Sequence, residues 1–223
     1  MKKYLLLSIL ITFLFSSFSI TQAHATLLST FDSGLEEWTV IGGAKNLAWN
    51  SSGGNPGGYI SAQEAKMSKT WWFRSPDAWA GDWTPYIGGM ISFDIIDIPQ
   101  DQNDYEFGGH GAYYQYVDVV IVMDIYNRAW WASGIAPLDN WTSYRVQLLA
   151  SNFTVVTNSG KTFEDIMSNV QRLCIRGEYF RGDDKEGLDN VRVAPVPEPA
   201  TTILLGSGLI ALAGFRRKFR MKK

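Results

Sequence analysis

The chain has 223 residues, 46% of them hydrophobic and 14% aromatic, and a formal net charge of −2. That small charge hides an asymmetry, because 12 basic residues stand against 22 acidic ones between residues 26 and 199, a balance of −10. An acidic body argues against nucleic acid and anionic lipid as partners, and is compatible with divalent cations or neutral glycans. The single cysteine, Cys174, excludes an intrachain disulfide.

The N-terminus has the pattern of a secretory signal peptide. Residues 2–3 are basic, residues 4–20 are uncharged and mostly apolar, and A-H-A at 23–25 is a small-x-small cleavage site. We therefore expect residues 1–25 to form a signal helix that directs export and is then removed. The remaining body, residues 26–195, spans 170 residues, which suits one domain with a sizeable core.

The body is organised as many short strands. Apolar residues recur there at period two more often than at period 3.6, and turn signals such as S-S-G-G-N-P-G-G at 51–58 separate the runs. This pattern favours an all-β sandwich or jelly roll over a parallel α/β fold. The predicted strands are 28–31, 38–41, 47–50, 59–62, 70–74, 89–97, 117–124, 128–132, 142–148, 172–178 and 187–193.

One or two short helices complete the predicted fold. Thr162, followed by acidic residues at 164 and 165, is typical of a capping box. Apolar residues then recur at helical spacing and share one face, which we expect to cover one end of the core. A second helical turn is predicted at 75–80, where Pro76 suits a first helical position.

All nine tryptophans lie in the body, and four of them are candidate ligand-binding residues. Trp79 and Trp83 lie in or beside a loop. Trp130 and Trp131 are adjacent on a predicted strand, so their rings point to opposite faces. A flat exposed ring can stack on the apolar face of a sugar while nearby polar groups hold the hydroxyls. The alternative is that these rings fill the core or cover its ends.

Catalytic residue types are few. The body has one histidine, His110, without an accompanying G-x-S-x-G motif, and zinc would need three or four His or Cys ligands. A glycosidase needs two carboxyl groups about 5–9 Å apart, for which Asp94 with Asp97, or Asp118 with Asp124, are the possible pairs. We predict a protein that is not an enzyme and keep a hydrolase using paired aspartates as the alternative.

The C-terminal segment has three parts: V-P-E-P at 196–199, an uncharged apolar run at 200–215, and six basic residues within 216–223. The run of 16 residues would be a membrane helix about 24 Å long, short of a hydrocarbon core of about 30 Å. The basic end would stay on the cytoplasmic side.

This three-part segment resembles the PEP-CTERM sorting signal of Gram-negative bacteria, and the residues that carry the motif are Val196, Pro197, Glu198 and Pro199. The resemblance implies an exosortase as the processing partner. The chain would cross the inner membrane, be anchored transiently by its C-terminal helix, and be released to the cell surface or extracellular matrix. A plain single-span anchor is the alternative, but it gives no reason for V-P-E-P.

The body resembles the laminin B, or laminin IV, domain. The similarity lies in W-N-S-S-G-G-N-P-G-G-Y-I-S at 49–61, G-G-M-I-S-F-D-I at 88–95, I-R-G-E-Y at 175–179 and G-L-D-N-V-R-V at 187–193. It implies a galactose-binding-like jelly-roll β-sandwich over residues 26–195, an extracellular module without catalytic activity. Fold alone does not fix its ligand.

The same resemblance implies a structural calcium ion where the first and last strands meet. Asp32 follows the first predicted strand and Asp189 lies in the last, so strand pairing could bring the two carboxylates together. Calcium takes six to eight oxygen ligands. The acidic segments at 181–187 and 101–104 are weaker candidates, and we interpret 181–187 as a solvated loop.

The sequence therefore predicts an exported surface or matrix protein that holds exopolysaccharide or other matrix components. Two alternatives remain beside it: the hydrolase, which predicts a cleft with paired carboxylates, and a purely structural protein–protein module. The latter predicts a contiguous exposed apolar patch.

Overall fold

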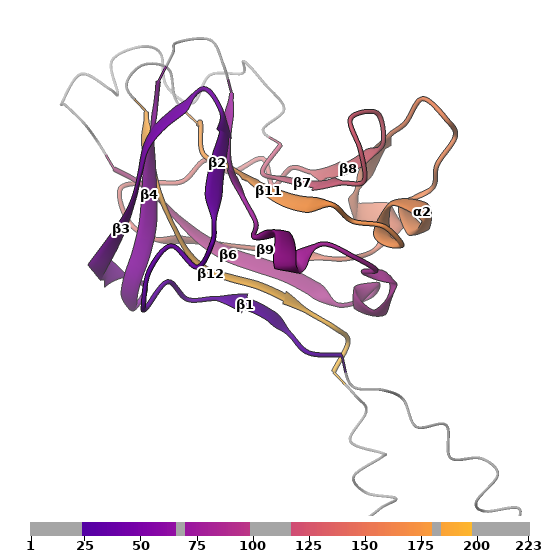
Figure 1. Ribbon diagram of the computed structural model, residues 1–223, viewed down its shortest axis with the longest axis horizontal. Coiled ribbons are helices and arrows are strands. Elements are labelled where there is room, and N and C mark those ends of the chain that lie inside the picture. Colours follow the sequence, from indigo (N-terminus) through magenta and orange to yellow (C-terminus); the bar gives the residue numbers. More distant parts are fainter. Residues whose placement is uncertain (1–23, 66–69, 99–116, 180–183, 198–223) are drawn as a thin grey trace, which may run out of the picture.

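The computed structural model describes residues 24–65, 70–98, 117–179 and 184–197, which fold as an all-β sandwich of two antiparallel sheets (Figure 1). In sheet A the strands lie in the order β3 (Ala44–Gly54), β4 (Gly57–Glu64), β12 (Lys185–Ala194), β6 (Met90–Asp97) and β9 (Thr142–Gln147), and β1 (Leu27–Ser29) pairs with β12. In sheet B the order is β10 (Thr154–Val156), β8 (Arg128–Trp131), β7 (Val119–Val122), β11 (Arg172–Arg176), β5 (Trp71–Arg74) and β2 (Thr39–Gly42).

The predicted strands are found at shifted bounds, and two segments differ more. The predicted turn at 51–58 is mostly strand, because β3 and β4 continue along the same hairpin and leave only residues 55–56 between them. β12 begins at Lys185, inside the segment 181–187 that we interpreted as a solvated loop. That interpretation is wrong for Asp184 and Glu186, which are buried. β10 was not predicted.

The core lies between the inner faces of the two sheets. In sheet A, Ile60, Leu188 and Ile95 are in register on three neighbouring strands and are fully buried. In sheet B, every second residue of β7 and β11 points inward in the same way. Large rings close the ends of this core, among them Trp38, whose ring lies 5.5 Å from that of Trp79 in an edge-to-face arrangement.

The predicted capping-box helix is present as α2 (Phe163–Met167). The Asp165 backbone N–H donates to Thr162 Oγ1 over 3.1 Å, and the Thr162 N–H donates to the Asp165 carboxylate over 2.9 Å. Phe163 and Ile166 point into the core. The helical turn predicted at 75–80 is the short 3₁₀ helix η1 (Asp77–Trp79), and η2 (Thr84–Tyr86) and η3 (Ala150–Asn152) are two more such turns.

The two ends of the sandwich domain lie side by side, because Leu27 on β1 pairs with Val193 on β12. Residues 1–23 of the predicted signal peptide and residues 198–223 of the predicted sorting signal lie outside the described residues. Within the part of the chain that is described, no helix has the length and apolar character needed to cross a membrane.

Candidate functional site

The outer face of sheet B carries a groove of about 500 Å³, within the usual range for ligand sites. It lies on the outer face because the inner-facing residues of β7, Val119 and Ile121, are fully buried in the core and alternate with those that line the groove. The sheet B groove, as we call it, is lined by Ile41, Trp72, Val117, Val120, Val122, Asp124, Ile125, Arg128, Trp130, Val156, Arg172 and Cys174.

Strand register sets the order of these side chains. Trp130, Val120 and Cys174 are direct cross-strand partners on β8, β7 and β11, so they form one row across the groove floor. Arg128, Val122 and Arg172 form the next row. Trp72 lies three strands from Trp130, which is about 14 Å at about 4.8 Å per strand. Two half-buried indole rings therefore lie well apart along one groove, a spacing suited to an extended ligand.

Polar groups line the groove on the side of the Trp130 row that faces away from Trp72. The Arg172 Nε atom is buried and has no hydrogen-bond partner. Asp124 accepts hydrogen bonds from the backbone and side-chain nitrogens of Asn127, and the side-chain bond in particular lowers the pKa of the Asp124 carboxyl. Burial raises the pKa of the Cys174 thiol to about 11, so this residue is a neutral part of the floor. Aromatic rings together with arginine and carboxylate groups in one groove suit a neutral molecule rich in hydroxyl groups.

The four tryptophans predicted to bind ligand lie in different places. Trp130 lines the sheet B groove, whereas Trp131 on the same strand turns to the inner side and packs against the core. Trp79 and Trp83 are buried, with 8% and 2% of their surface exposed, and the Trp83 indole N–H donates to the Trp79 carbonyl over 2.7 Å. A binding role for the four stays a prediction. Of these four residues, Trp130 lines the groove and the other three do not.

Trp72 is the groove residue that the sequence prediction missed. The signal was present in W-W at 71–72, because adjacent strand residues point to opposite faces. Trp71 is fully buried and Trp72 faces the groove.

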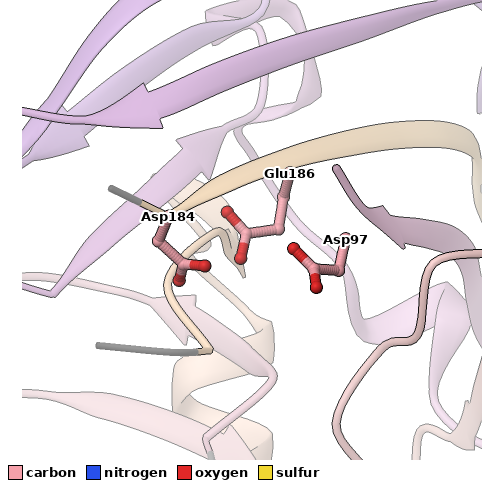
Figure 2. A group of neighbouring side chains, drawn as sticks. All are labelled: Asp97, Asp184 and Glu186. Carbon is pink, nitrogen blue, oxygen red and sulfur yellow. The ribbon is translucent and has the colours of Figure 1, made fainter. Parts of the chain in front are cut away.

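A cluster of acidic residues lies inside the sandwich, where β12 begins beside the end of β6. Asp97, Asp184 and Glu186 are buried, and one carboxylate oxygen from each lies within 4.8 Å of the others. Figure 2 shows the three carboxyl groups converging from β6, from β12 and from the residue just before β12. A buried acidic triad of this kind could bind calcium, whose ligands are carboxylate and carbonyl oxygens.

Asp32 and Asp189, the predicted calcium ligands, both lie beside the β3–β4 turn on the other side of sheet A. A side chain at Gly57 would collide with the Asp32 carboxylate, and the Asn55 N–H donates to Asp189 over 2.6 Å. Burial above all, with smaller contributions from the Asp94 and Asp32 carboxylates, raises the pKa of Asp189 to about 6. Their binding of calcium stays a prediction.

The carboxylates considered for hydrolysis are placed apart. Asp94 and Asp97 lie on opposite faces of β6, since Asp94 is paired with Asp189 on the outer face and Asp97 with Glu186 on the inner face. Asp118 and Asp124 flank β7, and a separation of six positions along an extended chain places them about 20 Å apart. Asp118 is buried and accepts hydrogen bonds from Ser133 N–H and the Tyr179 hydroxyl.

Two predicted residues of the tail motif, Val196 and Pro197, are described and are exposed beyond the end of β12. Glu198, Pro199, the apolar run and the basic end lie outside the described residues, as do His110 and the acidic segment at 101–104.

Comparison with known proteins finds the PEP-CTERM protein-sorting motif at residues 195–218, so the chain carries this motif. A comparison with curated protein sequences gives no significant match. Among solved structures, the sandwich resembles the family 11 carbohydrate-binding module of the Clostridium thermocellum cellulase Lic26A-Cel5E. The TM-score is 0.51 at 17% identity, over 80% of this chain and 99% of that one.

Two further solved structures are similar. The same type of module, from Clostridium thermocellum and in complex with a β-1,3-1,4-mixed-linked tetrasaccharide, gives a TM-score of 0.51 at 17% identity, over 80% of this chain and 100% of that one. The L4b domain of human laminin alpha-2 gives 0.49 at 9% identity, over 76% of this chain and 97% of that one. At these identities the likeness concerns the fold. The chain thus combines a PEP-CTERM sorting motif with a β-sandwich similar to carbohydrate-binding modules and to a laminin domain.

Proposed function

We propose that the protein is a non-catalytic carbohydrate-binding module of the bacterial surface, and that the sheet B groove holds a polysaccharide chain. The observation that carries the proposal is the pair of half-buried rings, Trp72 and Trp130, at separate places along one groove that Arg128 and Arg172 also line. Two separated stacking surfaces suit a linear chain of sugars better than a single small molecule.

Two findings support this function. The similarity to carbohydrate-binding modules supports glycan binding by a sandwich of this kind. We propose that the sandwich is of the galactose-binding-like jelly-roll type that the sequence predicts. The sorting motif supports export, processing by an exosortase and delivery to the cell surface, where exopolysaccharide or other matrix components are available as ligands. The hydrolase alternative has less support, because neither aspartate pair lies on one face of a strand at the required spacing.

Binding to a panel of soluble polysaccharides tests the proposal directly. The purified full-length chain is run in affinity electrophoresis through gels that contain mixed-linkage β-glucan, xylan or the exopolysaccharide of the producing cells. We expect retardation by at least one of them. Trp72→Ala and Trp130→Ala should each weaken binding about tenfold or more, since a central ring is worth more than about 1.4 kcal/mol.

The matched control is Trp49→Ala, which removes an exposed ring from sheet A, away from the groove. It should leave retardation unchanged. Lack of retardation by every polysaccharide, or an equal loss in the Trp49 variant, would contradict the proposal.

Cys174 provides an independent footprint, because it lies on the groove floor and is the only cysteine of the chain. Its pKa of about 11 leaves little thiolate at pH 8, so labelling by iodoacetamide should be roughly 100-fold slower than for an exposed thiol. A bound polysaccharide should slow it further. Labelling at an unchanged rate with saturating ligand would place the ligand elsewhere.

A further inference from the structure

On the inner face of sheet A, an apolar side chain is followed by an acidic one at the next inward-facing position of β12. Leu188 on β12 lies between Ile60 and Ile95, as expected in a core. Two residues earlier on the same face, Glu186 is paired with Asp97 on β6. The positions that alternation assigns to the interior therefore hold two directly opposed carboxyl groups, an arrangement that destabilises a sheet unless the charge is neutralised.

Glu186 has no neutralising partner among the described residues. Its exposed fraction is 0%, and neither carboxylate oxygen has a hydrogen-bond partner, since the neighbouring Tyr179 N–H donates to Asp184. A side chain that is buried, acidic and without a donor needs either a proton or a cation beside it.

Asp184 supplies the third carboxyl group of the cluster and is held in place by hydrogen bonds. Its carboxylate accepts from the Tyr179 N–H over 2.7 Å, and its carbonyl accepts from the Glu64 N–H over 2.7 Å. Tyr179 follows β11 of sheet B, whereas Glu64 ends β4 of sheet A, so Asp184 is held from both sheets. The three carboxyl groups are thus presented by rigid elements rather than by one flexible loop.

We propose that Asp97, Asp184 and Glu186 bind a calcium ion that joins the two sheets at this end of the sandwich. Each of the three side chains offers a carboxylate oxygen within 4.8 Å of the others, and oxygen ligands match calcium and not the His and Cys ligands of zinc. Magnesium keeps several of its waters and suits a buried, three-carboxylate site less well. The site is separate from the sheet B groove, so the inference does not depend on glycan binding.

The test uses the full-length chain stripped of metal with EDTA and then titrated with calcium. With calcium at 100 times its Kd, the melting temperature should rise by about 5 °C or more. Glu186→Gln should lose most of this rise, while its melting temperature in EDTA stays at or above that of the unmodified chain, because the substitution removes an uncompensated buried charge. Asp97→Asn is the second variant, should Glu186→Gln not fold.

Glu164→Gln is the matched control, because it neutralises an exposed acidic residue of α2 and leaves the triad intact. Its calcium response should equal that of the unmodified chain. The proposal is overturned if calcium leaves the melting temperature unchanged. It is equally overturned if Asp32→Asn abolishes the response while Glu186→Gln and Asp97→Asn retain it, since calcium would then bind at the β3–β4 turn.

Discussion

Strands β6 and β12 carry two acidic pairs, one on each face of sheet A, and the two faces treat them differently. On the outer face Asp94 is paired with Asp189, and on the inner face Asp97 is paired with Glu186. Both pairs oppose two carboxyl groups across neighbouring strands, where like charges repel. The outer pair is surrounded by protein donors, whereas Glu186 has none.

The donors of the outer pair come from two asparagines and a serine. Asp94 accepts from Ser143 Oγ over 2.6 Å and from the side-chain nitrogens of Asn190 and Asn55 over 2.9 and 3.2 Å. Asp189 accepts from the backbone N–H groups of Asn55 and Asn190. Burial still raises the pKa of Asp189 to about 6. Hydrogen bonds from the chain can thus hold an opposed acidic pair that is itself buried.

The repulsion between opposed carboxyl groups on neighbouring strands can be relieved in two ways. Where polar side chains can reach the carboxylates, the chain supplies its own donors. At Glu186, whose two carboxylate oxygens have no hydrogen-bond partner, neutralisation has to come from a proton or a bound cation.

The largest effect is expected from removing a donor on the outer face. Asn190→Ala deletes the bonds to Asp94 and to the Asn55 carbonyl and places alanine at a backbone φ of 51°. We expect a loss of about 3 kcal/mol in the free energy of unfolding in urea, from an unsatisfied carboxylate and left-handed backbone together. Asn190→Gly tolerates that φ and should lose about 2 kcal/mol. A loss below about 0.5 kcal/mol in both variants would mean that these donors do not stabilise the outer pair.

Isosteric amides should separate the two faces by the sign of their effect. In EDTA, Asp94→Asn removes an acceptor from a satisfied cluster and should cost about 1–2 kcal/mol. Glu186→Gln removes a buried charge without a donor and should gain about 1 kcal/mol under the same conditions. Urea denaturation of the two variants side by side measures both. Destabilisation of equal size in the two would remove the distinction between the faces.

The smallest effect on the free energy of unfolding is expected at the N-terminal capping box of α2. Asp165 forms the capping box of α2 with Thr162. Thr162→Ala should cost about 1 kcal/mol, with and without calcium. Thr162→Ser keeps the hydroxyl and should cost less than half of that, as measured by the same urea titration. A calcium-dependent loss at this helix would show that the metal acts beyond the triad.

Local patterns in the sequence predicted the local features of the fold. Thr162 and Asp165 are three residues apart, so their capping box can be recognised without knowing the fold. The strands follow from alternation, and the sorting motif follows from the order of its three parts. Adjacent tryptophans on one strand gave the correct rule for Trp130 and Trp131, one outward and one inward.

The triad could not be predicted because its members meet only through strand register. Asp97 and Glu186 are 89 positions apart, and a shift of one residue in β12 would turn Glu186 to the outer face. The charged run at 181–187 has the composition of a loop, and nothing local marks Glu186 as buried. Trp79 and Trp83 illustrate the converse, because their loop-like surroundings fold over the end of the core.

The most direct test of these two ways of relieving the repulsion is the position of calcium in crystals of the protein grown with the ion. An anomalous difference map at long wavelength should show a peak about 2.3–2.6 Å from carboxylate oxygens of Asp97, Asp184 and Glu186, and none between Asp94 and Asp189. A peak between Asp32 and Asp189 with an empty triad would contradict the account, as would a protein that binds calcium at neither place.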